Sequence, residues 1–152
     1  MYTEYIIQFI VAMIATFGFA IVFNAPKSEL FFCGLSGAIG WIFYSIISAT
    51  LGAPTLGNIV GSLLLTMFSR TLAAKRKNPV TVYLIAGIFP LVPGAGIYYT
   101  SYYLIMNDMT TFSSYGLSTI KTAGAIVMGI IFGMVFPQSW FNKAFAPSCH
   151  KS

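Results

Sequence analysis

Long uncharged segments alternate with short polar ones along the whole chain. Lysine, arginine, aspartate and glutamate are absent from residues 5–26, 30–69, 78–107 and 122–142. A helix that crosses the hydrocarbon layer of a membrane needs about 20 mostly apolar residues. By this measure the first and last segments fit one span each, and the second fits two. The third segment is long for one straight span and short for two.

Turn-forming residues divide these segments further. Asn24 and Pro26 follow the first apolar run, and Gly52 and Pro54 interrupt the second segment. Proline and glycine at such points are typical of helix ends. The pattern predicts an all-α, polytopic membrane protein with about five transmembrane helices in a single integral membrane domain. The predicted spans are 5–24, 30–51, 56–74, 80–106 and 115–136, with 107–114 as a loop and 137–152 as a short cytoplasmic tail.

The composition agrees with this pattern. Of the 152 residues, 57% are hydrophobic and only 7% are charged, whereas a soluble domain carries about 25% charged residues. So few charges cannot cover a soluble domain, and lipid is the expected surroundings. The densest basic group, at residues 75–77, lies between two apolar runs. Such clusters set membrane orientation and contact anionic lipid headgroups, so no nucleic-acid partner is expected.

Two orientations remain open because the fourth run is interrupted. If every run crosses and the N-terminus is outside, only Lys121 lies on the outer side. The residues then on the cytoplasmic side are Lys27, Arg70, Lys75, Arg76, Lys77, Lys143 and Lys151. If the fourth run re-enters instead, Lys121 moves inside while Lys143 and Lys151 move outside. The first orientation has the stronger positive-inside bias and is preferred.

The interruption of the fourth run is the clearest candidate site. Pro90, Pro93, Gly94 and Gly96 lie within seven residues of an otherwise apolar run. Proline removes a backbone donor, and freed backbone groups at membrane depth are tolerated only inside protein or beside water. Broken helices form solute sites in many transporters, and the helix that restarts after the break directs amide groups at an anion. The alternative is a kink that serves packing alone.

Three more residues are weaker candidates for contact with a solute. Tyr98 follows the break, although tyrosines here also fit an interfacial aromatic belt. Asn58 shares one face of the third run with Ser62 and Thr66, a face that either lines a path or bonds to a neighbouring helix. Arg70 lies deeper than the basic cluster and either extends to the interface or attracts anions at the cytoplasmic mouth.

Small residues recur at helical spacing. Gly57 and Gly61 form one GxxxG pair, and Gly129 and Gly133 form another. Because lipid provides no hydrophobic drive between helices, such positions favour close backbone packing. We therefore expect helix–helix contacts there, within the chain or against a partner.

The chain lacks the residues of an enzyme or a metal site. Its carboxylates lie at the ends of runs or in loops, and no nucleotide-binding loop, HExxH motif or nucleophile elbow is present. Cys33, Cys149 and His150 have no ligand-spaced partners. No catalytic activity, metal or cofactor is expected, and proton coupling would require a titrating group from another subunit.

Several segments resemble the threonine/serine exporter family. They are FAIVFNAP at 19–26, GLSGAIG at 34–40 and above all PVTVYLIAGIFPLVPGAGIYYT at 79–100. The family often has a proline shortly before Pro90, where this chain has Ala86 and Gly87. The resemblance spans most of the chain in the same order, and it is closest to the small subunit of a split exporter.

This resemblance implies a role and a partner that composition does not. Family members export threonine and serine, or dicarboxylates such as succinate, and some are split into a large and a small membrane subunit. It implies a multi-pass subunit of a secondary transporter in a bacterial inner membrane. That subunit would act with a larger subunit on a small polar solute. Dicarboxylate export and a non-transporting scaffold remain the alternatives.

Overall fold

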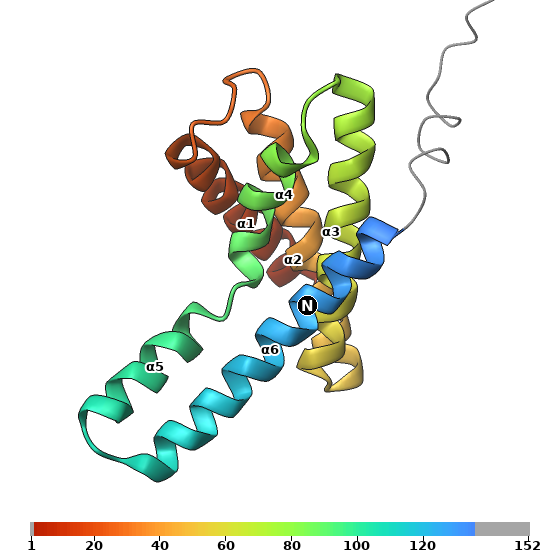
Figure 1. Ribbon diagram of the computed structural model, residues 1–152. Coiled ribbons are helices and arrows are strands. Elements are labelled where there is room, and N and C mark those ends of the chain that lie inside the picture. Colours follow the sequence, from red (N-terminus) through yellow and green to blue (C-terminus); the bar gives the residue numbers. More distant parts are fainter. Residues whose placement is uncertain (1, 136–152) are drawn as a thin grey trace, which may run out of the picture.

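The computed structural model describes residues 2–135, and the regular structure in this range is entirely helical (Figure 1). The elements are α1 (Tyr2–Val22), α2 (Leu30–Leu51), α3 (Pro54–Arg76), α4 (Val80–Ile88), the 3-10 turn η1 (Phe89–Leu91), α5 (Gly94–Ile105) and α6 (Met109–Val135). The predicted all-α class is confirmed. The predicted tail, 137–152, lies outside the described residues.

Four of these helices, α1, α2, α3 and α6, are long and apolar enough to cross a membrane. A fifth span results if the bent pair Val80–Leu91 and Gly94–Ile105 is counted as one. This agrees with the predicted number of about five. Large apolar side chains are exposed along these helices, for example Ile6 at 60% and Ile14 at 63%, as expected for surfaces that face lipid.

The predicted loop at 107–114 is wrong for most of its length, because α6 already begins at Met109. Asp108 caps this helix: its carboxylate accepts bonds from the Thr111 amide at 3.2 Å and from the Thr110 and Thr111 hydroxyls at 2.8 and 2.6 Å. These bonds lower the pKa of Asp108, and the bond from the Thr111 side chain has the largest effect. The sequence signal was available, since aspartate before a Thr-rich segment is a typical N-cap.

Two connections meet at one end of the bundle, which we call the basic end. The α1–α2 connection holds Glu29, and α3 ends at Arg76. The Arg76 Nε donates to the Glu29 carboxylate at 2.6 Å, so both connections lie on the same side, at the top of Figure 1. The α2–α3 connection lies at the opposite end.

Glycines allow the helices to pack closely, as the GxxxG spacing predicted. A methyl group added at Gly133 would lie 2.7 Å from the Thr66 side chain, and one at Gly129 would meet Ser62 and the backbone of α3. Gly61 likewise faces the Gly40 carbonyl, 2.8 Å from an added methyl group. These contacts hold α3 between α2 and α6.

The antiparallel pair α5–α6 projects from the rest of the bundle (Figure 1). α5 packs chiefly on the N-terminal half of α6 and contains no buried residue. We call residues 94–124 the arm. Only the C-terminal half of α6, with Ala125, Ile126, Gly129 and Gly133 buried, joins the bundle.

Candidate functional site

The predicted break in the fourth run opens the backbone where the arm joins the bundle. The chain leaves helical geometry at Val92 (φ −61°, ψ 131°) and becomes helical again at Gly94, with a 56° bend between the two helical parts. The residue before a proline is biased toward extended ψ. Val92 precedes Pro93 and is extended, whereas Pro90 is accommodated at the start of η1. Pro93 therefore causes the main interruption.

A cavity of about 410 Å³ adjoins this break. Its walls come from α2, the start of α3, the break and the N-terminal half of α6. They consist of Trp41, Tyr44, Pro54, Asn58, residues 90–96, Tyr115, Ser118, Thr119 and Thr122. Small-molecule sites typically measure about 300–1,000 Å³, so the space suits a small metabolite.

The break is sheltered from lipid on its bundle side. Leu91 is 4% exposed and belongs to a core cluster with Leu65, Leu84 and Ile126. On the α1 side, the Phe89 ring stacks on Phe19 with the ring centroids 4.3 Å apart. Freed backbone groups at membrane depth are expected only where protein or water surrounds them. Protein covers Leu91, whereas Val92, Gly94 and Ala95 are exposed and line the cavity.

Four of the seven predicted site residues from the sequence pattern lie in the break: Pro90, Pro93, Gly94 and Gly96 all line the cavity. The Gly94 amide donates to the Val92 carbonyl at 2.8 Å, whereas the next two amides of α5, at Ala95 and Gly96, have no intrahelical acceptor and receive no side-chain cap from Pro93. This helix start carries a partial positive charge. The amides of Ala95 and Gly96 can therefore donate hydrogen bonds to a carboxylate in the cavity.

Polar side chains line the opposite walls. Asn58 is 4% exposed, and its amide nitrogen donates to the Pro54 carbonyl at 2.9 Å. Thr119 and Thr122 donate their hydroxyls to carbonyls of their own helix at 2.7 and 3.1 Å. A hydroxyl that donates in this way still has lone pairs to accept a bond from a solute. The cavity thus combines amide donors with hydroxyl acceptors.

Ser62 and Thr66 do not line the cavity, although they share a helix face with Asn58. Both are fully buried and donate to carbonyls of α3, each at 2.7 Å. They pack beneath Gly129 and Gly133 of α6. Neither alternative for this face holds for these two residues, because their hydroxyls bond within α3 and their side chains pack against α6; Asn58 alone of the three lines the cavity.

Arg70 lies elsewhere. The residue is 3% exposed, and one guanidinium nitrogen, Nη1, donates to the carbonyl oxygens of Gly133 and Met134, both at 2.8 Å. These are among the last carbonyls of α6, where a cation is favourable to the helix dipole. The structure thus places Arg70 at the end of the α3–α6 contact and not in the cavity wall.

Tyr98 is also outside the cavity wall. It is 62% exposed, and its ring stacks on Tyr102 with the centroids 6.3 Å apart. The other arm tyrosines form a similar cluster, in which Tyr103 and Tyr115 stack at 5.6 Å. This arrangement fits the aromatic-belt interpretation of these side chains.

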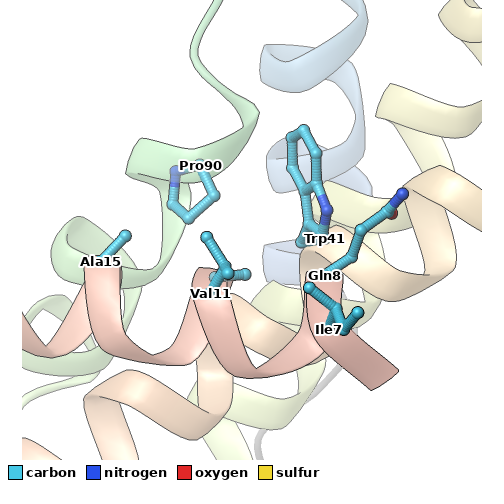
Figure 2. Close-up of a pocket in the computed structure, with 7 residues that line it drawn as sticks. Ile7, Gln8, Val11, Ala15, Trp41 and Pro90 are labelled. Carbon is cyan, nitrogen blue, oxygen red and sulfur yellow. The ribbon is translucent and has the colours of Figure 1, made fainter. Parts of the chain in front are cut away.

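Two aromatic residues that sequence reasoning missed also line the cavity. Trp41 and Tyr44 of α2 have ring centroids 5.2 Å apart. Trp41 and Pro90 also line an apolar pocket of about 290 Å³ on the α1 side. Figure 2 shows the Pro90 ring facing Val11 and Ala15 of α1, with Trp41 beside Gln8. The two residues are three positions apart in α2, a spacing that places them on one helix face.

A second polar cluster at the basic end was also missed. Glu29 is 3% exposed and accepts bonds from Arg76 Nε at 2.6 Å and from the Tyr83 hydroxyl at 2.7 Å. The Arg76 bond, with Tyr83 assisting and burial opposing, lowers the pKa of the Glu29 carboxyl. Glu29 therefore remains charged at neutral pH and ties α2, α3 and α4 together. Residues 2–135 contain no cluster of three metal-ligating side chains.

These features define an all-helical membrane protein in which an interrupted helix lines a polar cavity, a construction typical of transporters. The sequence profile of the family described as "Threonine/Serine exporter, ThrE" matches residues 8–136. The chain therefore belongs to the threonine/serine exporter family, and the resemblance to this family is confirmed. The family match supports a transport role in a membrane.

One relative is the "Threonine/serine exporter" of Corynebacterium glutamicum. It is 26% identical over 133 residues, which cover 87% of this chain and 27% of the relative. The chain thus spans about a quarter of the length of this relative. No solved structure matches the chain.

Proposed function

We propose that this chain forms part of a path by which threonine and serine leave a bacterial cell through the inner membrane. The observation that carries the proposal is the cavity of about 410 Å³ at the interrupted helix. The helix-start amides of Ala95 and Gly96 and polar side chains of α3 and α6 belong to residues that line it. The carboxylate of an amino acid would bind the amides, and its hydroxyl would bond to Asn58 or Thr122.

The lining favours an amino acid over a dicarboxylate. Among the residues that line the cavity in the described part of the chain, none is lysine or arginine. One helix start suits one carboxylate. A second carboxylate in the same cavity would lack a cationic partner, so its removal from water would be unfavourable. Dicarboxylate export therefore ranks second.

The bend favours a fourth run that crosses the membrane. An angle of 56° between its two parts carries the chain onward, whereas a re-entrant hairpin reverses direction. With five crossings and the N-terminus outside, the basic end is cytoplasmic, which agrees with the positive-inside rule. The cavity then lies in the outer half of the bundle, because Pro54 and Asn58 belong to the outer turns of α3.

The partner in this proposal is a larger membrane polypeptide of the same family, consistent with the chain's match to only 27% of its relative. The arm is the surface we assign to it. Ile97 and Ile105 of α5 are 52% and 82% exposed. Lys121 is exposed near the middle of the 27-residue helix α6. A cation at such depth is costly against lipid, so a partner helix is the expected cover.

Export of labelled threonine tests the proposal in cells that contain the larger polypeptide with and without this chain. Gly94→Leu is the decisive variant, because a side chain added at Gly94 meets nothing within 4 Å and fills cavity space without a clash. We expect export to fall by about tenfold or more. Gly18→Leu is the matched control, since Gly18 of α1 is equally open but distant in sequence from the break.

The same experiment separates transport from scaffolding. If Gly94→Leu and Pro93→Ala abolish export while the complex still assembles, a pure scaffold role is excluded. Normal export by both variants would show that the solute does not pass the break.

A further inference from the structure

A second polar cavity lies beside the first, between the outer ends of α1 and α2. Its volume is about 300 Å³. Its lining residues are Glu4, Tyr5, Gln8, Tyr44, Ser45, Ser48 and Ala49. Glu4 and Gln8 lie one turn apart on α1, and Ser45 and Ser48 one turn apart on α2. The two helices therefore present matching polar faces at a depth where their other side chains are mostly apolar.

One hydrogen bond joins these faces. The Ser45 hydroxyl donates to the Gln8 side-chain oxygen at 2.8 Å. Such a bond alone would be ordinary packing between membrane helices. Here, however, a cavity large enough for a small solute remains beside it, and Glu4 is one of its lining residues.

Tyr44 connects the two cavities, because it lines both of them. Its position is held from the side of α3. A methyl group at Gly57 would lie 3.1 Å from the Tyr44 ring, and one at Gly61 would lie 3.2 Å from its Cβ. The Tyr44 side chain therefore lies between the break and the second cavity. It packs against the backbone of α3 at Gly57 and Gly61 and cannot move closer to that helix.

We propose that the second cavity is an outer binding subsite for the ammonium group of the exported amino acid. Glu4 is the only carboxylate among its lining residues in the part of the chain that the structure describes. Gln8, Ser45 and Ser48 supply neutral acceptors around it. The two cavities thus differ in charge preference: amides at the break favour a carboxylate, and Glu4 favours a cation. A solute that moves from one cavity to the other passes Tyr44.

The identity of the ligand rests on the proposed function, but the presence of a water-filled, cation-attracting cavity does not. Accessibility of a cysteine tests the cavity directly. Ser48→Cys is placed in a chain with Cys33→Ala and Cys149→Ala and expressed with the larger polypeptide. Intact cells are treated with thiosulfonate reagents of equal size, one carrying trimethylammonium and one carrying sulfonate. Thr50→Cys, also on α2 but not in the cavity wall, is the matched control.

We expect the cationic reagent to modify Ser48→Cys about threefold or more faster than the anionic one. Adding Glu4→Gln should remove this preference. Thr50→Cys should show no preference with or without Glu4→Gln. Threonine should slow the modification of Ser48→Cys, and succinate should not.

Three outcomes would overturn the proposal: no modification from outside, equal rates for the two reagents, or protection by succinate instead of threonine. These are distinguishable from failure of the proposed function. Normal threonine export by Gly94→Leu would remove the path through the break, whereas a charge-selective Ser48→Cys would still establish the outer cavity.

Discussion

The basic end of the bundle and the region around the break both contain polar groups, but these groups have different partners. At the basic end, Glu29 and Arg70 are buried and bonded to other helices at 2.6 to 2.8 Å. Around the break, polar groups such as Ser118 remain exposed, and Asn58 bonds only within its own helix. At the basic end, polar groups hold helices together. Around the break, polar groups remain available to a ligand.

The same contrast divides α6. Its C-terminal part is packed on α3 through Gly129 and Gly133, where an added methyl group would clash, whereas Gly124 at the end of the arm has nothing within 4 Å of an added methyl group. We call the packed part of the bundle, including the α3–α6 contact, the closed region, and the surroundings of the break the open region. Substitutions in the closed region should therefore lower the stability of the protein, and substitutions in the open region should lower the rate of transport. The following expectations test this division, from the largest effect to the smallest.

Gly129→Leu should cause the largest loss of stability. A side chain there meets Ser62 and the α3 backbone, which cannot move aside, so overpacking should cost about 3 kcal/mol or more. Thermal unfolding of the detergent-solubilised protein measures this. Gly124→Leu on the same helix is the matched control and should unfold as the unmodified chain does. Equal stability of the two variants would contradict the close α3–α6 contact.

Arg70→Ala should come next. It removes the donor to the carbonyls of Gly133 and Met134, and the loss of buried, charge-assisted bonds should cost about 2 kcal/mol. Arg70→Lys should recover part of that, since it keeps a cation at the end of α6. Unfolding curves and threonine export should be recorded together. Unchanged stability with reduced export would instead favour the anion-gate interpretation of Arg70.

Glu29→Gln should have a smaller effect on stability, of about 1 kcal/mol, because Arg76 is partly exposed and water screens the pair. The pH dependence gives a sharper test. A lowered folded-state pKa means that the contribution of Glu29 is complete above the ordinary glutamate pKa of about 4.3 and is lost as pH falls through the lowered value.

Unfolding of the unmodified chain from neutral pH to acid should therefore show a loss that Glu29→Gln lacks. The difference between the two proteins should be constant above about pH 5 and should shrink only at lower pH. A difference that already shrinks near pH 7 would mean that Glu29 binds a proton in the folded state, contrary to its bonds with Arg76 and Tyr83.

Asn58→Leu should reduce threonine export by about fivefold with little change in stability, because its one recorded bond is to its own helix. Asn58→Gln, which keeps the amide group, should recover part of the export. The initial rate of efflux at several internal threonine concentrations measures the effect. A loss of stability equal to that of Gly129→Leu would place Asn58 in the closed region instead.

Tyr98→Phe should have the smallest effect. Tyr98 is 62% exposed on the arm and does not line the cavity. Removal of its hydroxyl should leave the rate of export unchanged and the free energy of unfolding within about 0.5 kcal/mol of that of the unmodified chain. A marked loss of export, with assembly intact, would show that the solute path extends along α5.

The existence, number and approximate limits of the helices could be predicted from the sequence, because crossing a membrane requires uncharged apolar runs of a minimum length. Gly129 and Gly133 were also recognised as packing positions, since small residues at this spacing let membrane helices approach. The start of α6 was misplaced by the polar residues 109–114, where the Asp108 cap outweighed the loop-like composition. Local chemistry visible in the sequence thus explains both the success and the error.

The sequence alone determined that this chain is a helical membrane protein with an interrupted fourth run, because hydrophobic length and proline geometry are local properties. Which polar residues surround the interruption was decided only by the tertiary structure. Ser62 and Asn58 share a helix face, yet one is covered by Gly129 and the other lines the cavity. Arg70 and Glu29 looked like end-of-helix charges until their partners, distant in sequence, were brought beside them. Burial and pairing depend on what the other helices place opposite, and no local pattern records that.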